Sequence, residues 1–325
     1  MFAYIVRRFL FMIPILLGVN LLTFALFFLV NTPDDMARVH LGQKHVTKDA
    51  IENWKEHHGY DKPLFYNDQL QSEDKFTDTI FFQKSLRMFV FDFGFSDAGR
   101  DITYDISQRM WPSLAIAIPS LIIALIVNIS LALLMIFFRY SYLDTFGVIA
   151  CVTLMSISGL FYIIGGQYLI AKTLLLVPIS GYIPGWQIGK FLILPVLVGI
   201  VSGIGSGVRW YRTLFLEEAN KDYVRTARSK GLKESAVLFK HILGNALIPI
   251  LTGVVALLPL LFLGSLLTES FFGIPGLGSY TIDAIGQQDF AIVRSIVFLG
   301  SFLYIIGLLL TDISYTLVDP RVRFK

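Results

Sequence analysis

The chain is poor in charge for its length. Of its 325 residues, 16% are Asp, Glu, Lys or Arg, whereas 55% are hydrophobic and the mean hydropathy is +0.66. A soluble domain carries about 25% charged residues. The formal net charge of +3 is also too small to indicate a nucleic-acid partner. The scarcity of charge therefore excludes an ordinary soluble domain and favours a membrane protein in contact with the lipid bilayer.

The sequence also lacks the patterns that enzymes and metal sites require. Its single cysteine, Cys151, excludes an internal disulfide, and no Cys/His spacing typical of a metal site occurs. The nearest approach to a phosphate-binding loop, Gly189-Lys190-Phe191, has proline at 184 and phenylalanine at 191 where the motif needs glycine and Ser or Thr. No Gly-x-Ser-x-Gly or His-Glu-x-x-His motif occurs either. We therefore expect that the chain is not an enzyme and has no catalytic, metal or cofactor residues of its own.

Long apolar runs are what the sequence has in abundance. A membrane-spanning helix needs roughly 20 apolar residues. Six stretches qualify: 9–30, 113–138, 145–171, 191–208, 246–267 and 291–317. The first is too long for a signal peptide and lacks a small-residue cleavage site. The sequence predicts an all-α integral membrane protein with about six transmembrane helices.

The distribution of Lys and Arg sets the expected orientation, because cytoplasmic loops are enriched in both. With the N-terminus inside, the inside segments carry fourteen of these residues, whereas the short outside loops carry only Lys172 and Lys190. Both termini are therefore expected in the cytoplasm. The expected regions are a cytoplasmic N-terminus with the first helix (1–30), an extracytoplasmic region (31–108), a five-helix domain (109–317) and a cytoplasmic C-terminus (318–325).

Two features of the spans suit packing or gating. Gly199, Gly203 and Gly207 repeat every four residues and so share one helix face, where another helix of this chain or of a second subunit can approach closely. Pro249 and Pro259 each remove a backbone hydrogen bond and permit a kink. Such kinks serve gating in some helices and are passive in others, and both interpretations stay open.

Ionisable groups inside the spans are nearly absent. Asp312 is the one acidic residue well inside an expected span, near its cytoplasmic end. An intramembrane carboxylate is a functional candidate, although a structural role suits this depth. The lack of further ionisable groups argues against a stand-alone transporter driven by protons or sodium.

Residues 209–243 form a polar, patterned segment between the fourth and fifth expected spans. Residues 217–230 contain no Pro or Gly and predict a short helix, and Gly231 suits the left-handed residue that ends many helices. Apolar residues then follow at spacings of three and four, which predicts one stripe on a second helix: Leu232, Ala236, Phe239 and Leu243. Such a segment can lie on lipid headgroups or fit a groove on a partner protein. The short stripe and the mixed charge favour a protein partner.

The run Asp-Tyr-Val-Arg-Thr-Ala-Arg-Ser-Lys-Gly-Leu at 222–232 resembles the cytoplasmic loop of membrane subunits of bacterial ATP-binding-cassette (ABC) importers. It looks most like the oligopeptide/dipeptide/nickel permease branch. Four further segments are similar to that branch: 5–10, 240–249, 268–278 and 319–323. The general importer pattern opens the loop with Glu-Ala-Ala, whereas this chain has Arg225-Thr226-Ala227, as is usual for the peptide branch.

The resemblance implies a type I ABC importer transmembrane fold in the bacterial inner membrane. The chain would form the translocation path for di- or oligopeptides together with a second, homologous permease subunit. Two cytoplasmic subunits would bind ATP and Mg and drive transport, and an extracytoplasmic solute-binding protein would deliver the cargo. Relatives of the same class carry other cargo, such as nickel or heme, and a secondary transporter or channel working alone is the alternative from another class.

The resemblance also assigns a role to the 209–243 segment. It would be the coupling element that fits a groove on an ATPase subunit, with the small Ala227 facing that groove. The residues that would carry this role are Arg225, Thr226, Ala227, Arg228, Lys230, Gly231, Leu232, Glu234, Ala236 and Phe239.

Overall fold

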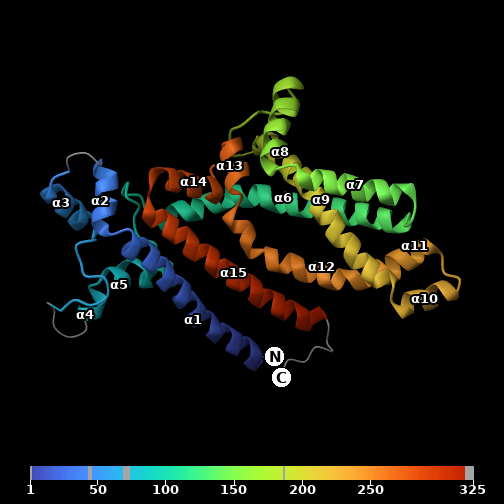
Figure 1. Cartoon of the computed structure of the whole chain (residues 1–325), viewed down its shortest axis with the longest axis horizontal. Helices are drawn as coiled ribbons and strands as arrows, with labels where there is room; N and C mark the ends of the chain where they lie inside the picture. The colour runs from blue at the N-terminus through green and yellow to red at the C-terminus, as the bar shows by residue number, and fades with distance from the viewer. Residues whose placement is uncertain (1, 43–45, 69–73, 186, 319–325) are drawn as a thin grey trace. The chain divides into compact units, whose positions relative to one another are not determined.

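The computed structural model describes residues 2–42, 46–68, 74–185 and 187–318, and this part is almost entirely helical (Figure 1). The expected C-terminal segment, including the similar run at 319–323, lies outside the described residues. Within them, the β-type pairing consists of one isolated bridge between Phe95 and Asp101.

The helices follow one another with connections of different lengths. In chain order they are α1 (Phe2–Ala25), α2 (Pro33–Leu41), α3 (Lys48–His58), α4 (Asp74–Thr77), α5 (Ile80–Lys84), α6 (Ile102–Phe137), α7 (Tyr142–Ser156), α8 (Gly159–Gly166), α9 (Ile188–Ala219), α10 (Asp222–Ser229), α11 (Glu234–Ala236), α12 (Gly244–Leu257), α13 (Leu266–Phe272), α14 (Leu277–Gln287) and α15 (Phe290–Val318). Widened π-helical segments follow three of them, namely η1 (Leu26–Val30), η3 (Gln167–Thr173) and η4 (Val237–Leu243). Two segments are 3-10 helices, η2 (Leu86–Val90) and η5 (Pro259–Leu263).

The membrane architecture predicted from the sequence is confirmed. In the described part, five helices are long and apolar enough to cross a membrane, or six if one bent pair is counted as a span. That pair replaces the straight third span expected over 145–171, which is wrong as a single helix. α7 and the helix formed by α8 and η3 meet at an angle of 88°. The break falls at Ile157 and Ser158, whose extended backbone cannot continue a helix.

The chain divides into two compact units, which are described separately. Unit 1 comprises Met1–Gln108 and Thr281–Ile306, and unit 2 comprises Arg109–Tyr280 and Gly307–Lys325. Unit 1 thus combines the region expected outside the membrane with the first span and part of the last.

The core of unit 1 is aromatic. Phe24 and Phe28 near the end of the first span are buried and lie 4.6 Å apart between ring centroids. They pack with three further buried residues from the region beyond that span: Met36, Tyr60 and Ile80. Thr32 begins α2 with a capping box, in which Thr32 and Asp35 satisfy each other's backbone N–H. The polar region therefore folds as short, capped helices on an aromatic core.

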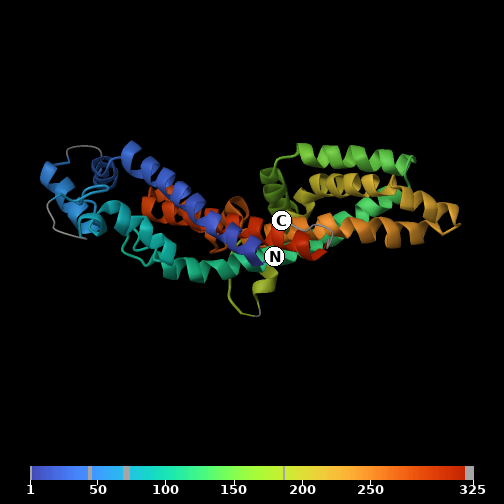
Figure 2. The ribbon, with the colours of Figure 1, turned by 90° about the horizontal axis from the view of Figure 1, so that it is seen from below.

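Unit 2 is built around the pair α7 and α9, which run side by side in Figure 2. Gly205 lets the two helices approach, because a Cβ there would lie 2.6 Å from the Cys151 carbonyl oxygen. Near the start of α7, Asp144 accepts two hydrogen bonds from the Arg212 guanidinium, at 3.0 and 2.9 Å. This pair and the glycine fix α7 against the polar end of α9.

Candidate functional site

The segment predicted to carry the function begins with α10 in unit 2. The single helix expected over 217–230 is wrong, because α9 ends at Ala219 and α10 begins at Asp222. Lys221 between them is extended, with φ −71° and ψ 150°. The Tyr223 hydroxyl donates to the Glu218 carboxylate across the break. Burial and this carboxylate raise the pKa of Tyr223 to about 12.

One face of α10 is buried inside the chain itself. Val224 is fully buried and Ala227 is 5% exposed, and both belong to the core that α9 and α12 share. The expectation that Ala227 faces a groove on a partner is therefore wrong. Its small side chain lets α10 lie close to its own bundle, so Ala227 positions the segment.

The predicted left-handed glycine turn is present after α10. Gly231 has φ +77°, its N–H donates to the Arg228 carbonyl at 2.9 Å, and the Leu232 N–H donates to the Ala227 carbonyl at 3.4 Å. These two bonds form a Schellman motif, in which the left-handed position favours glycine. The turn reverses the chain from α10 into α11.

The second half of the segment differs from the predicted separate helix. α11, η4, α12 and η5 form one helical run from Glu234 to Leu263, so the segment continues directly into the fifth span. Residues 237–243 are π-helical, which adds residues to each turn and rotates the expected stripe. Leu243 consequently packs against the core, Ala236 is half-buried, and Leu232 and Phe239 remain exposed.

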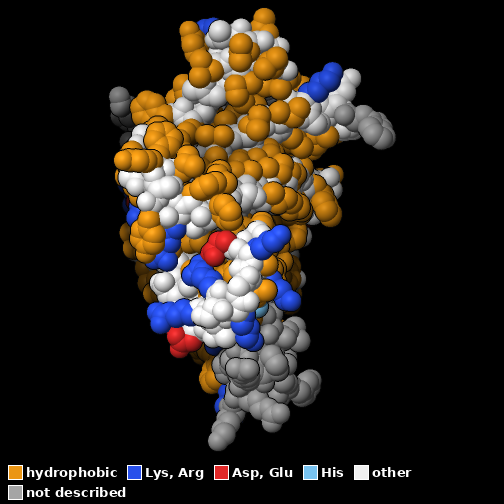
Figure 3. Space-filling model, turned by 90° about the vertical axis from the view of Figure 1, so that its right-hand side faces the viewer, with side chains coloured by type: hydrophobic (Ala, Val, Ile, Leu, Met, Phe, Trp, Pro, Cys, Tyr) orange, Lys and Arg blue, Asp and Glu red, His pale blue; other side chains and the backbone are white. Residues whose placement is uncertain are grey.

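The exposed surface of the segment combines apolar and charged side chains. Leu232 is 44% exposed and Phe239 is 60% exposed. Around them stand the exposed side chains of Arg225, Thr226, Arg228, Lys230, Lys233 and Glu234. Figure 3 shows charged side chains gathered in the lower part of this view, with a hydrophobic face above them. We call Leu232, Phe239 and these polar neighbours the α10–α11 surface.

One ion pair spans the glycine turn. The Arg228 guanidinium donates two hydrogen bonds to Glu234, from Nε at 3.2 Å and from Nη2 at 2.6 Å. Both side chains are more than 40% exposed, with values of 43% and 47%. Such a pair contributes about 0–1 kcal/mol, so its main effect is to hold the two arms of the turn in one geometry.

The remaining sequence-predicted residues lie elsewhere in unit 2. A Cβ on Gly207 would lie 2.3 Å from Asn128 Nδ2, whereas a Cβ on Gly199 would make an ordinary 3.6 Å contact with Ser120 Oγ. The stripe therefore meets α6 at these two positions. A Cβ on Gly203 would find nothing within 4 Å, so contact with a second subunit there stays a prediction.

The prolines and the span carboxylate take different positions. Pro249 lies inside α12, and Pro259 begins η5 inside the same helical run, so each removes a backbone hydrogen bond from that run. Asp312 is half-buried on α15. Their roles in gating stay predictions.

A buried carboxylate that the sequence analysis did not single out organises the end of this helical run. Glu269 on α13 is 1% exposed and accepts hydrogen bonds from the backbone N–H groups of Ser265 at 3.2 Å and Ser279 at 3.0 Å. Gly264 and Gly276 leave the space it occupies, since a Cβ on either would lie 1.9 or 2.2 Å from its oxygens. We call this arrangement the Glu269 latch. The repeated glycines at 264, 273, 276 and 278 were the signal in the sequence.

A cavity of about 310 Å³ lies beside the latch. Its lining is mostly apolar, with Ile116, Leu260 and Leu261 among its residues, and includes a few polar side chains such as Ser120, Ser202 and Glu269.

The fold defines a multi-pass membrane protein, and its α10–α11 surface exposes both apolar and charged side chains. A family model described as the inner membrane component of binding-protein-dependent transport systems matches residues 130–324. The model of the N-terminal part of such components matches residues 1–90. The chain belongs to this family of ABC importer membrane subunits, as the sequence resemblance predicted.

Several relatives are similar over the whole chain. The oligopeptide transport system permease protein AppB of Bacillus subtilis is 31% identical over 338 residues, covering 100% of both chains. The dipeptide transport system permease protein DppB of Alkalihalophilus pseudofirmus is 27% identical, and the glutathione transport system permease protein GsiC of Pectobacterium atrosepticum is 29% identical, each again over 100% of both chains.

Proposed function

We propose that this chain is the permease subunit of an ABC importer for short peptides, and that its α10–α11 surface couples it to an ATPase subunit. The observation that carries this proposal is the pair of exposed apolar side chains, Leu232 and Phe239, on a segment that is otherwise polar and anchored by a buried face. Exposed apolar residues with a charged rim favour a protein interface.

The proposed assembly contains this chain, a second homologous permease subunit, two cytoplasmic ATP-binding subunits and an extracytoplasmic solute-binding protein. ATP and Mg belong to the ATP-binding subunits, and the chain itself contributes no ATPase site. The termini face the cytoplasm and residues 31–108 face outward, consistent with the distribution of Lys and Arg. Peptide cargo is supported by the names of the three relatives given above, and none of these three is named for nickel or heme.

The segment can transmit motion because of how it is connected. Val224 and Ala227 fasten α10 to the bundle, and Glu234 begins a helical run that continues to Leu263. A shift of the α10–α11 surface therefore displaces a membrane helix. Such a shift reaches the bundle when an ATPase partner contacts this surface differently in its two nucleotide states.

The test replaces the two exposed apolar residues together, as Leu232→Ser/Phe239→Ser. We expect normal membrane abundance, weaker co-purification of the ATPase subunits and at least tenfold lower uptake of a radiolabelled dipeptide, because the interface loses its apolar centre. Tyr142→Ser is the matched control, since Tyr142 is 95% exposed in the other expected cytoplasmic loop. Normal uptake and normal ATPase association in the double variant contradict the proposed coupling role.

A further inference from the structure

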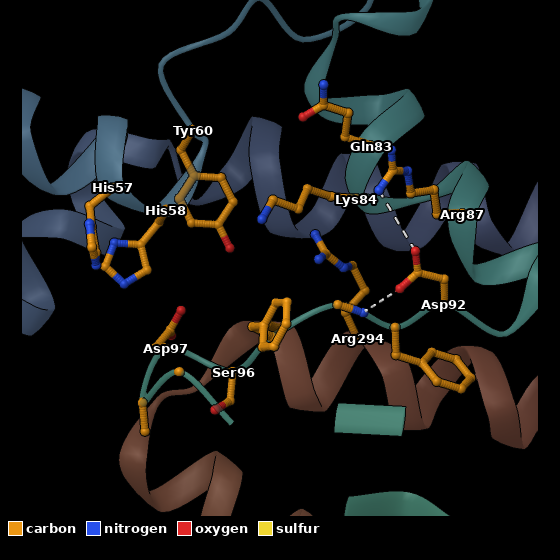
Figure 4. A pocket seen from close by; sticks show the side chains of 16 residues that line it. His57, His58, Tyr60, Gln83, Lys84, Arg87, Asp92, Ser96, Asp97 and Arg294 are labelled. Carbon is orange, nitrogen blue, oxygen red and sulfur yellow. Dashed lines mark hydrogen bonds and ion pairs between the residues drawn. The ribbon is translucent and has the colours of Figure 1, made fainter. Parts of the chain in front are cut away.

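A second cavity, of about 700 Å³, lies entirely within unit 1 and has no part in the coupling segment. It is lined by the end of α3 and Tyr60, by Gln83, Lys84 and Arg87, by residues 92–99 and by the first turns of α15. Its volume is in the range of small-molecule sites. Figure 4 shows its charged side chains converging from several elements.

One wall of the cavity carries a buried guanidinium. Arg294 on α15 is 3% exposed, and its guanidinium lies 5.1 Å from the centroid of the Phe28 ring. Among the described residues, its Nε has no hydrogen-bond partner. A buried cation that lacks part of its hydrogen bonding is costly, because it has lost water without full replacement. A ligand carboxylate beside Arg294 would supply negative charge next to this buried cation.

A second cation stands beside the first. Lys84 at the end of α5 places its Nζ 5.2 Å from the centroid of the Tyr60 ring, and the described residues contain no ion pair to it. Burial and the charge of Arg294 lower the pKa of Lys84. In Figure 4 the Lys84 amine and the Arg294 guanidinium point toward the same space. Together they form the cationic pole of the cavity.

Another wall carries a carboxylate. Asp97 is 3.1 Å from His40 Nε2, and its backbone N–H donates to Asp289 at 3.0 Å. Burial and the charge of Asp289 raise the pKa of Asp97. Figure 4 shows Asp97 across the cavity from Lys84. A ligand cation at Asp97 would offset the repulsion from Asp289.

From the two poles we infer that this cavity binds a small zwitterion, whose carboxylate lies between Lys84 and Arg294 and whose ammonium lies toward Asp97. Free amino acids and short peptides belong to this class. The preference for a peptide over other zwitterions rests on the proposed function, whereas the two poles rest on the geometry alone. The positive charges of the cationic pole would repel a metal cation, and no metal-ligating cluster is found among the described residues.

The experiment measures equilibrium binding of radiolabelled Ala-Ala to the full chain in nanodiscs, with the subunits that co-purify and without a solute-binding protein. We expect saturable binding that falls at least tenfold for Ala-Ala amide and for each of the variants Lys84→Gln and Arg294→Gln. Asp97→Asn should weaken binding of Ala-Ala but not of N-acetyl-Ala-Ala. Lys48→Gln, which removes an exposed charge of unit 1 away from the cavity, is the matched control and should bind normally.

Three outcomes overturn the inference. They are absence of saturable binding, unchanged affinity in both Lys84→Gln and Arg294→Gln, and a site that takes inorganic phosphate but not Ala-Ala. Lys84→Gln keeps the test valid if Arg294→Gln does not fold. Dipeptide uptake by cells is measured in parallel, so that normal uptake without binding in the cavity contradicts this inference alone, whereas uptake that survives deletion of the chain contradicts the proposed function.

Discussion

The Glu269 latch gives a sharp prediction for stability. Replacing Glu269 by alanine removes the acceptor of two backbone N–H groups, those of Ser265 and Ser279. The buried Ser279 donor left without a partner costs about 1–3 kcal/mol, and the part-buried Ser265 donor adds less, so we expect Glu269→Ala to lower the free energy of unfolding by about 2–4 kcal/mol. Glu269→Gln should cost less, because its amide oxygen can still accept one of the two bonds.

The assay is thermal unfolding of the purified chain in detergent, followed by loss of the monodisperse peak in size-exclusion chromatography. The expected loss corresponds to a fall in Tm of at least about 3 °C. Ser270→Ala is the matched control, because the neighbouring Ser270 hydroxyl is buried and has no hydrogen-bond partner among the described residues. The control should melt at or above the wild-type temperature. Equal Tm values for Glu269→Ala and Ser270→Ala would refute the reasoning.

The same latch should make stability depend on pH. Burial raises the pKa of Glu269, while hydrogen bonds from Ser113 and from backbone N–H groups oppose this rise. The folded state then holds a proton at pH values where the unfolded chain, with a pKa of about 4.3, has released it. Stability should therefore fall as pH rises from about 4 to the raised pKa and stay level above it. A wild-type pH profile identical to that of Glu269→Gln would contradict this assignment.

Two further predictions concern the other end of the bundle. Gly231→Ala should cost about 1–2 kcal/mol of backbone strain and lower dipeptide uptake at normal membrane abundance, because a Cβ there meets nothing within 4 Å and the φ of +77° is the sole obstacle. The control is Gly286→Ala, where a Cβ also meets nothing within 4 Å and φ is not positive. Equal uptake in both variants would contradict the role of the turn. Asp144→Ala should leave the Arg212 guanidinium without its acceptor, lower the free energy of unfolding by about 1–3 kcal/mol and so reduce membrane abundance. The double variant Asp144→Ala/Arg212→Ala should partly restore the abundance. A double variant less abundant than the single one would contradict that pairing.

The number and places of the spans followed from the sequence because length and hydropathy alone decide them. The break in the third span did not follow, since residues 145–171 are apolar throughout and the bend lies in the backbone at Ile157 and Ser158. The π-helical winding of 237–243 was equally hidden. It depends on tertiary packing, which overrides a periodicity of 3.6 residues.

The site was predictable where local chemistry dominates and hidden where packing does. Gly231 was identified because a helix end needs a left-handed residue that glycine supplies. The prediction for Ala227 was wrong, because the spacing of small residues does not tell whether such a residue faces the core of its own chain or a partner protein. Glu269 and Arg294 were passed over because each owes its importance to partners distant in sequence or to burial.

The α10–α11 surface and the Glu269 latch lie at opposite ends of one helical run, which suggests that they act together. The run from Glu234 to Leu263 is 30 residues long, or about 45 Å at 1.5 Å per residue. Gly264 ends it with φ +68°, and Glu269 holds the chain that follows. A displacement of the α11 end moves the rest of the bundle only if the hydrogen bonds of Glu269 keep the other end of the run attached to α13.

This arrangement predicts that a weakened latch loosens coupling as well as stability. At a temperature where it remains folded, Glu269→Gln should lower the number of dipeptides taken up per ATP hydrolysed by the assembled transporter, because motion of the run is absorbed at Gly264 rather than passed to α13. Ser270→Ala should leave that ratio unchanged. If Glu269→Gln also leaves it unchanged while lowering Tm, the latch serves stability alone and the two ends of the run act independently.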